Sequence, residues 1–285
     1  MKLLTFLAKR FVAGETAAEA VAAARRVNAR GVGAIIDYLG EHQASPDAAR
    51  AAVSEYLRLI EAIRESGVPA SISLKASQMG LLVSPDVCLE NLLTVAQHAG
   101  RFGIRVWIDM EGSDLTQKTI DVFERLRPRC ENAGICLQAA LVRTGSDLDK
   151  LMRQPLSVRL CKGAYKEPPS IAYTAKRAVD GSYRMLARKL LEAIPRGAYP
   201  AFATHDRALI HEILGAAREK GVDPKQFEFE MLYGIENNYL ETLAAQGYQG
   251  QVYIPYGTDW FPYFMRRLRE RKENVYFLVR NLLRM

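Results

Sequence analysis

Short apolar runs alternate with longer segments of helical periodicity along most of this 285-residue chain. The runs are rich in Val, Ile, Leu and Phe, as strands buried on both faces are. They are GAIIDYL from Gly33, ASISLKA from Ala70, IRVWIDM from Ile104, ICLQAAL from Ile135, SVRLCKG from Ser157, PAFATHD from Pro200, FEFEMLY from Phe227 and QVYIPYG from Gln251. This alternation predicts βα units and a parallel sheet.

Eight βα units within about 250 residues is the size of a (β/α)₈ barrel. A doubly wound sheet would more often carry a glycine-rich phosphate turn, and the sequence contains neither G-x-G-x-x-G nor a P-loop. The predicted fold class is therefore α/β, a (β/α)₈ TIM-like barrel with N-terminal helices and a C-terminal helix over the barrel mouth. No Pro/Gly/Ser-rich linker divides the chain. We expect one domain over residues 1–285, with an N-terminal helical segment at 1–30, the barrel at 31–256 and a C-terminal helix and tail at 257–285.

The segment before the first strand reads as a helix. Thr16 and Glu19 form a capping box, alanines fill the helix body, and Gly31 ends it. This predicts at least one helix outside the eight βα units.

Composition restricts the cellular context and the partners. Basic residues exceed acidic ones, 39 to 32, which gives a formal charge of +7 and favours anionic partners. The four cysteines show no C-x-x-C spacing and are expected to be reduced thiols of a cytoplasmic protein. The N-terminal apolar run is interrupted by Lys9 and Arg10, and no segment has the roughly 18 apolar residues of a membrane span. Any membrane contact is therefore expected to be peripheral.

Polar side chains stand at or near the end of nearly every predicted strand. They are Asp37, Lys75, Asp109, Gln138, Arg159, Lys162, His205, Glu230, Tyr253 and Tyr256. In a barrel the carboxyl ends of the strands surround one opening, so these side chains are predicted to converge there. Taken singly, any one of them could instead begin the polar loop that follows its strand.

The charges of this set favour an anionic, phosphate-bearing ligand, because Lys75, Arg159 and Lys162 are all cationic. The histidines lack metal-ligand spacing such as H-E-x-x-H, and no metal site is expected. Lys75 has two readings: a Schiff-base lysine, or a permanently charged lysine paired with Asp109.

The stretch FMRRLRER, from Phe264, has four arginines in eight residues. If residues 260–273 are helical, one face presents apolar side chains and packs, and the other presents polar ones. The apolar face is Phe261, Phe264, Met265 and Leu268, and the polar face is Tyr263, Arg266, Arg267 and Glu270. The polar face is either solvated or, since the helix follows the last strand directly, leans over the barrel mouth and holds a carboxylate.

Eight motifs, in order and at matching intervals, resemble proline dehydrogenases over almost the whole chain. They are RFVAGET, VWIDMEG, QAAL, VRLCKGAY, ATHD, FEFEMLYGI, VYIPYG and RRLRERKEN. The likeness is closest to the short monofunctional bacterial enzymes, which are related to the proline dehydrogenase domain of proline utilization A. It implies an FAD-dependent (β/α)₈ barrel preceded by N-terminal helices.

The resemblance also implies site residues. Asp109 and Arg159 would be catalytic, with Arg159 close to the reactive flavin nitrogen. The substrate site would comprise Lys75, Leu232, Tyr253, Tyr263, Arg266, Arg267 and Glu270, with Arg266 and Arg267 on the proline carboxylate. The contacts to non-covalent FAD would be Met110, Gln138, Arg159, Lys162, Gly163, Ala164, Thr204 and His205. Asp206 departs from the asparagine common in the family, which leaves the role of its loop open.

The implied reaction is oxidation of L-proline to Δ1-pyrroline-5-carboxylate, the first step of proline catabolism to glutamate, with electrons passed to a membrane quinone. A separate pyrroline-5-carboxylate dehydrogenase is an expected partner, and the expected location is the cytoplasm, with peripheral contact at the inner membrane. Tyr253 is bulky where relatives that oxidise hydroxyproline have smaller residues, which favours proline.

Two other functions remain open at this stage. The first is a Schiff-base aldolase or lyase that uses Lys75. The second is a non-catalytic basic protein that binds polyanions through RRLRER, in which Arg269 and Arg271 would matter as much as Arg266 and Arg267. The resemblance favours the enzyme and predicts no nucleic-acid partner.

Overall fold

The structure, a computed structural model, describes residues 10–42 and 44–270, and for residues 268–270 it describes the backbone alone. Within this range eight strands form a closed barrel in which each neighbouring pair is parallel, including β1 with β8. The strands are β1 (Gly33–Tyr38), β2 (Ala70–Lys75), β3 (Val106–Asp109), β4 (Ala133–Gln138), β5 (Leu156–Cys161), β6 (Ala198–Ala203), β7 (Glu228–Leu232) and β8 (Gln249–Tyr256). The predicted (β/α)₈ barrel is confirmed.

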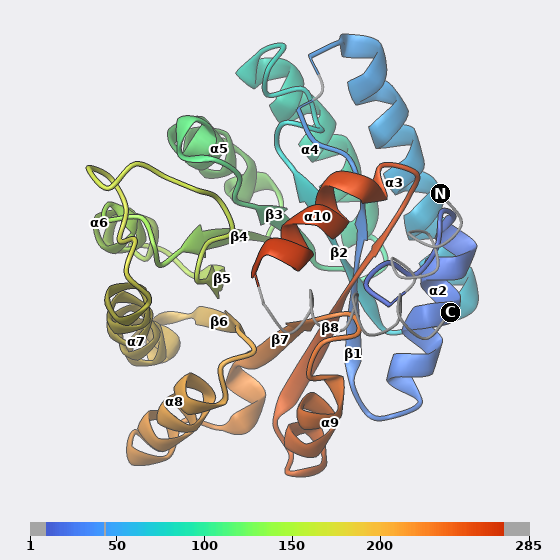
Figure 1. Ribbon diagram of the computed structural model, residues 1–285. Coiled ribbons are helices and arrows are strands. Elements are labelled where there is room, and N and C mark those ends of the chain that lie inside the picture. The colour runs from blue at the N-terminus through green and yellow to red at the C-terminus, as the bar shows by residue number, and fades with distance from the viewer. Residues whose placement is uncertain (1–9, 43, 271–285) are drawn as a thin grey trace, which may run out of the picture.

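Helices surround the strands on the outside of the barrel (Figure 1). They are α2 (Ala17–Asn28), α3 (Pro46–Ser66), α4 (Pro85–Gly100), α5 (Ser113–Leu126), α6 (Thr144–Leu151), α7 (Lys176–Ala193), α8 (Arg207–Glu219) and α9 (Asn237–Ala245), with single 3₁₀ turns η1 (Arg127–Arg129), η2 (Ile194–Arg196) and η3 (Pro224–Gln226). The last helix described, α10 (Trp260–Glu270), has a different position. In the described part of the chain, no helix combines the length and the apolar character needed to cross a bilayer.

Local capping explains where the helices before β1 and β2 begin and end. The predicted capping box of α2 is present, since the Thr16 hydroxyl accepts from the Glu19 amide and the Glu19 carboxylate accepts from the Thr16 amide. The hydroxyl of Ser45 caps α3, whose last residue is followed by Gly67 at φ 64°, a left-handed conformation that favours glycine. These caps fix the length of the connections that lead into the strands.

The two faces of the strands differ in chemistry. Outward-facing residues such as Val106 and Ile108 are buried in the main apolar core between barrel and helices. Inward-facing residues are mostly polar, and the apolar cluster inside the barrel consists of Ile35, Trp107 and Ala201 with Tyr253 packed against it. Barrel interiors are usually filled by branched apolar side chains, so this polar interior requires internal hydrogen bonds and ion pairs.

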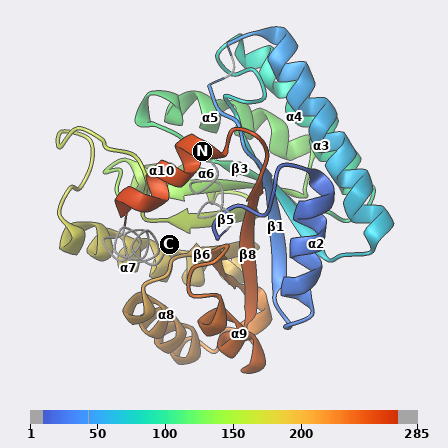
Figure 2. The same cartoon turned by 45° about the vertical axis from the view of Figure 1, so that its right-hand side comes forward.

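Helix α10 lies across the opening at the carboxyl ends of the strands (Figures 1 and 2). It is held by a second apolar cluster in which Phe264, fully buried, packs against Phe11 and Ile235. The predicted division of its faces is wrong in part: Phe261 is 50% exposed, whereas Tyr263 and Arg267 are 6% and 8% exposed. Because the helix crosses a polar opening, its polar side is also covered.

Two further sequence expectations can be compared with the fold. All four cysteines are free thiols. Tyr256 does not point into the barrel mouth: it packs in the outer core and its hydroxyl donates to Glu55 on α3, at 3.0 Å. Successive strand residues face opposite sides, so Tyr256, three residues after the inward-facing Tyr253, faces outward.

Candidate active site

Lys75 at the end of β2 is the buried cation of the barrel mouth. Its Nζ lies 3.1 Å from both carboxylate oxygens of Asp37 on β1 and 4.0 Å from Asp109 Oδ2 on β3. The expected partner Asp109 is therefore the weaker one, and Asp37 is the main one. Burial acts to lower the pKa of Lys75, but the two carboxylates outweigh it and raise the pKa, so the side chain stays an ammonium ion.

Asp109 joins three strands at the centre of the mouth. Its Oδ1 accepts from Arg159 Nη1 at 2.7 Å and from Ser73 Oγ at 2.9 Å, and its Oδ2 accepts from the Tyr253 hydroxyl at 2.6 Å. Burial and the adjacent Asp109 raise the pKa of Tyr253, so the phenol keeps its proton and donates it to the carboxylate. This network fixes the positions of both residues proposed as catalytic.

Arg159 is enclosed within the barrel, 3% exposed. Besides Asp109 it contacts Glu230 on β7, with 2.5 Å between Nε and Oε2, and its guanidinium carbon lies 4.7 Å from the centre of the Trp107 ring. A guanidinium packed between two carboxylates and an aromatic face is held in one orientation.

The arginines of α10 lean toward the mouth, as the second of the two readings of this helix required. Arg266 Nη1 lies 2.6 Å from Glu41 Oε1 in the β1–α3 connection, and its guanidinium carbon is 6.0 Å from the ring of Tyr165. Arg267 is 5.0 Å from the Tyr263 ring centre. Leu232 packs against the same cluster as Tyr263. The side chains of Glu270 and Arg269 lie outside the described residues, as does Arg271.

The loop after β5 offers an exposed backbone beside the mouth. Gly163 and Ala164 are exposed, and Gly163 has φ 115°, a conformation that favours glycine; a Cβ there would lie 3.1 Å from Ala140 Cβ and 3.3 Å from Gln138 Oε1. A backbone without side chains can approach a phosphate group closely. This loop therefore fits a phosphate-bearing cofactor.

Lys162 is already paired on this edge of the barrel. Its Nζ lies 2.6 Å from Asp180 Oδ1 and 2.9 Å from Asp206 Oδ2. Asp206 also caps α8 by accepting from the Ala208 amide, at 3.2 Å. The role of Asp206, open from the sequence, is thus to cap a helix and to neutralise Lys162, and a phosphate would compete with it for this lysine.

The remaining cofactor candidates lie at the ends of β3, β4 and β6. Gln138 is buried and its amide donates to the Glu111 carbonyl, at 2.8 Å, while Met110 is 6% exposed. Thr204 is 4% exposed and its hydroxyl accepts from the Asp206 amide. His205 Nε2 accepts from the Leu232 amide at 2.9 Å, which leaves Nδ1 as the protonated nitrogen of a neutral ring. These contacts fix the strand ends relative to one another.

One group in the described chain has metal-ligand chemistry: Glu41, His42 and Glu111 lie with ligand atoms within 4.8 Å of one another. Both carboxylates are engaged, because Glu41 pairs with Arg266 and Glu111 accepts from the amide and hydroxyl of Ser77. We interpret these three residues as part of the hydrogen-bond network around the mouth.

Sequence reasoning missed three residues of this site, Ser73, Glu41 and Tyr165, and the pairing of a fourth, Asp37. Ser73 stands two residues before Lys75 and so shares its side of the strand, a signal that was available. Asp37 was noted as a strand-end polar residue but not as the partner of Lys75. Glu41 and Tyr165 lie in loops, where no periodicity indicates direction.

Comparison with known proteins identifies the family of the chain. The sequence matches the family Proline dehydrogenase over residues 20–280. It is 38% identical over 277 residues to Proline dehydrogenase 1 of Bacillus subtilis (strain 168), covering 97% of this chain and 91% of that protein. It is 35% identical over 283 residues to Proline dehydrogenase of Deinococcus radiodurans, covering 98% and 90%.

A solved structure shares the fold of the chain. Proline utilization A from Bdellovibrio bacteriovorus, inactivated by N-propargylglycine, superposes with a TM-score of 0.86 at 25% identity, over 93% of this chain and 32% of that longer chain. The family match, the identities and the fold together lead to one conclusion: the chain belongs to the proline dehydrogenase family.

Proposed function

We propose that this protein is a flavin-dependent enzyme that oxidises L-proline to Δ1-pyrroline-5-carboxylate, the first step of proline catabolism to glutamate. The observation that carries the proposal is the charged mouth of the barrel: buried Lys75 and Arg159 and half-buried Asp109 and Tyr253 form one network under the arginines of α10. Family membership supplies the reaction, and the network supplies groups suited to a small zwitterion.

In this proposal Arg266 and Arg267 bind the carboxylate of proline by charge-assisted hydrogen bonds. Arg267 is buried against Tyr263, so it is oriented before substrate arrives. Arg266 is oriented by Glu41. Glu270, one helical turn beyond Arg266, is proposed to complete the lid formed by this helix.

The pyrrolidine ring would lie against Leu232 and the aromatic rings of Tyr253 and Tyr263. Leu232 is half-buried in the cluster beneath α10, and Tyr253 is held by Asp109. An apolar wall beside fixed charges orients a small ring and excludes water from it. The bulk of Tyr253 supports proline over hydroxyproline.

Lys75 is proposed to act as a fixed positive charge in the floor of the site. Its raised pKa and its two carboxylate partners argue against the Schiff-base alternative, because an ammonium ion is not a nucleophile. The burial of Arg267 argues against the polyanion-binding alternative, since a phosphate-binding patch needs accessible charge.

The proposed cofactor is FAD, bound without a covalent bond. Its contacts are proposed to be Met110, Gln138, Arg159, Lys162, Gly163, Ala164, Thr204 and His205. When bound, the flavin would supply the hydride acceptor. Arg159, held between Asp109 and Glu230, would stabilise negative charge that develops beside it.

The proposed electron acceptor is a membrane quinone, and the proposed location is the cytoplasm, with peripheral contact at the inner membrane. The formal charge of +7 supports attraction to an anionic bilayer. A pyrroline-5-carboxylate dehydrogenase is the proposed consumer of the product. We infer a single domain over residues 1–285, because the barrel strands span residues 33–256 without a break in the closed sheet.

Anaerobic titration tests the proposal directly. Purified protein should carry flavin absorbance, and L-proline should bleach it, because two electrons pass to the cofactor. Trans-4-hydroxy-L-proline should bleach it less readily. A preparation that neither contains nor takes up FAD, or whose flavin is unaffected by proline, would contradict the proposal.

A further inference from the structure

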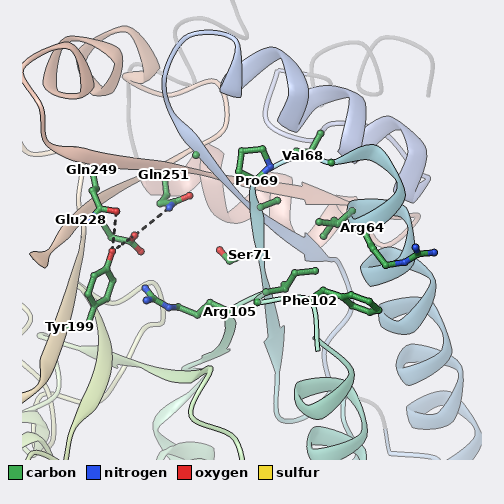
Figure 3. Close-up of a pocket in the computed structure, with 16 residues that line it drawn as sticks. Arg64, Val68, Pro69, Ser71, Phe102, Arg105, Tyr199, Glu228, Gln249 and Gln251 are labelled. Atoms are coloured by element: carbon green, nitrogen blue, oxygen red, sulfur yellow. Dashed lines mark hydrogen bonds between the residues drawn. The ribbon is translucent and has the colours of Figure 1, made fainter. Parts of the chain in front are cut away.

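A cavity of about 630 Å³ opens at the end of the barrel opposite the charged mouth (Figure 3). It is surrounded by the first residues of several strands, among them Gly33, Ser71, Tyr199 and Gln249, and by Arg105 just before β3. Its position between strand ends gives solvent a path toward the barrel interior.

Glu228, the first residue of β7, also lines this cavity and is 2% exposed. Its Oε2 accepts from the Tyr199 hydroxyl at 2.8 Å and from the Gln251 amide at 3.3 Å (Figure 3). No lysine or arginine of the described residues lies within ion-pair distance of it. A buried carboxylate without a cation is costly unless donors surround it.

Glu230 stands two residues further along β7 and therefore faces the same interior, also 2% exposed. Its Oε2 contacts Arg159, while its Oε1 is buried without a donor among the described residues. The two carboxyl groups lie within hydrogen-bond reach of each other. A proton held by one carboxyl group can therefore be donated to the other.

Carboxylates outnumber cations inside the barrel, which also favours a bound proton. Two buried cations, Lys75 and Arg159, face four carboxylates: Asp37, Asp109, Glu228 and Glu230. The groups around the pair are Arg159 on β5, which contacts Glu230, and Tyr199 on β6 and Gln251 on β8, which contact Glu228. Arg105 lies against the Tyr199 ring, and Asp109, Cys136 and Tyr253 surround Arg159. Burial raises the pKa of Glu230 to about 8, Arg159 opposes this and Glu228 adds to it.

We propose that Glu228 and Glu230 share one proton inside the barrel and exchange it with solvent through the cavity at the amino ends of the strands. In this exchange the carboxyl O–H bond breaks, the proton passes to solvent, and the negative charge remains opposite Arg159. The pair controls how much negative charge lies beside Arg159. While the proton is bound, the carboxylate opposite Arg159 is that of Asp109 alone; once the proton is lost, the carboxylate of Glu230 opposes Arg159 as well.

Infrared titration of the purified protein tests the shared proton. Wild-type protein should show a protonated, buried carboxyl group at pH 6.5 that is lost as pH rises through about 8. In Glu228→Gln the remaining carboxyl group has Arg159 but no carboxylate neighbour, so the signal should be lost at pH 6.5. Glu219→Gln, at the exposed end of α8, is the control and should leave it unchanged. Absence of the signal in wild type, or its persistence in Glu228→Gln, would overturn the proposal.

The route is tested by the rate at which the same signal shifts in heavy water. Ser71 lines the cavity, and Ser71→Leu would fill part of it. Exchange should become slower in this variant but not in Ser54→Leu on the exposed side of α3. Equal exchange rates in wild type and Ser71→Leu would overturn the assignment of the cavity as the route.

The consequence for the active site rests on the proposed function, and a potential measurement tests it separately. Compared with wild type at the same pH, the flavin potential should rise in Glu230→Gln at pH 9, where the wild-type pair has lost its proton, and fall in Glu228→Gln at pH 7, which leaves Glu230 ionised. A purely structural defect would not move the two potentials in opposite directions, and shifts of equal sign would overturn this role. Because the infrared titration needs no flavin, its failure and a failure of the flavin assignment are distinguishable.

Discussion

The two ends of the barrel differ in what fills them. At the carboxyl ends of the strands, cations and carboxylates are paired within a covered mouth, and α10 lies over them (Figure 2). At the amino ends a cavity of about 630 Å³ is open, and Glu228 at its inner side has no cation within ion-pair distance among residues 10–42 and 44–270. This cavity is therefore not where the catalytic residue types gather, and side-chain chemistry locates the site better than the presence of a cavity does.

The difference has a physical reason. Charged side chains that await a zwitterionic substrate cannot remain unpaired in a buried site, so they pair with one another until substrate arrives. Lys75 with Asp37, and Arg159 with Asp109, are such pairs. The amino-terminal end binds no ligand in the proposed reaction. It therefore needs no set of paired cations and carboxylates, and the proposed compensation for its two buried carboxylates is one shared proton. Substitutions at the two ends should therefore have unequal effects.

The largest expected effect follows removal of Asp109. Asp109→Ala leaves Arg159 and Lys75 each without one carboxylate and Tyr253 without its acceptor. Breaking a buried ion pair costs about 3–5 kcal/mol, so the free energy of unfolding should fall by that amount and proline oxidation should be lost. Urea unfolding and anaerobic flavin bleaching measure the two effects.

Arg105→Ala is the matched variant at the amino-terminal end. Its guanidinium carbon lies 4.0 Å from the centre of the Tyr199 ring, a contact worth about 0.5–1 kcal/mol at a partly exposed site. Proline oxidation should persist. Equal losses of activity in both variants would contradict the functional difference between the two ends.

The next effect in size concerns substrate binding. Arg267→Met should raise KM for proline about 10- to 100-fold, because a charge-assisted hydrogen bond contributes about 1.5–3 kcal/mol. Arg64→Met, at the rim of the opposite cavity, should leave KM unchanged. Steady-state kinetics with L-proline measures both. A KM for Arg267→Met within twofold of wild type would remove Arg267 from the substrate site.

The sequence predicted the barrel because its signal is distributed over the whole chain. Eight apolar runs at regular spacing specify eight strands, and the inward or outward direction of Asp109 and Tyr253 follows from alternation alone. Side-chain partners within the barrel were harder to predict. Lys75 was paired with Asp109, while the closer carboxylate is that of Asp37 on the other neighbouring strand. Strand order was predictable, but the direction a long side chain takes was not.

Helix α10 shows the limit of periodicity. Spacing assigned Phe264 to the packed face and Arg267 to the polar face, whereas both side chains are buried. Phe261 was assigned to the packed face and is exposed at the first turn, beyond the edge of the cluster. Glu41 lies more than 200 residues away in sequence, and local spacing carries no signal for its pairing with Arg266.

A smaller effect on substrate binding is expected when Glu41 is replaced. Its carboxylate orients Arg266 over the mouth from a partly buried position, with side chains 20% and 22% exposed. Glu41→Gln should therefore raise KM for proline about fivefold, the equivalent of about 1 kcal/mol, with little change in kcat. Glu219→Gln serves as the control for loss of one carboxylate elsewhere. A lower KM in Glu41→Gln would mean that Glu41 competes with the substrate for Arg266 instead of positioning it.

The smallest expected effect is on the pH dependence of stability, which should differ in sign between Asp206 and Glu230. Burial acts to raise the pKa of Asp206, but Lys162 and Lys176 outweigh it and lower the pKa to about 2. A carboxyl group with a lowered folded-state pKa adds stability above its unfolded value, and this is lost as pH falls from about 4 toward 2. Glu230, whose pKa is raised to about 8, has the opposite sign: its contribution to stability falls as pH rises from about 4.5 through 8.

Asp206→Asn isolates the charge, because asparagine caps a helix as well as aspartate does. Relative to wild type, the variant should lose about 1 kcal/mol of unfolding free energy at pH 6, allowing for solvent screening, and almost none at pH 2. Urea unfolding at the two pH values measures this difference. Equal losses at both pH values would show that the stabilisation does not come from the negative charge of Asp206 beside Lys162, and the carboxyl groups at the two ends of the barrel would then no longer differ in the sign of their pH dependence.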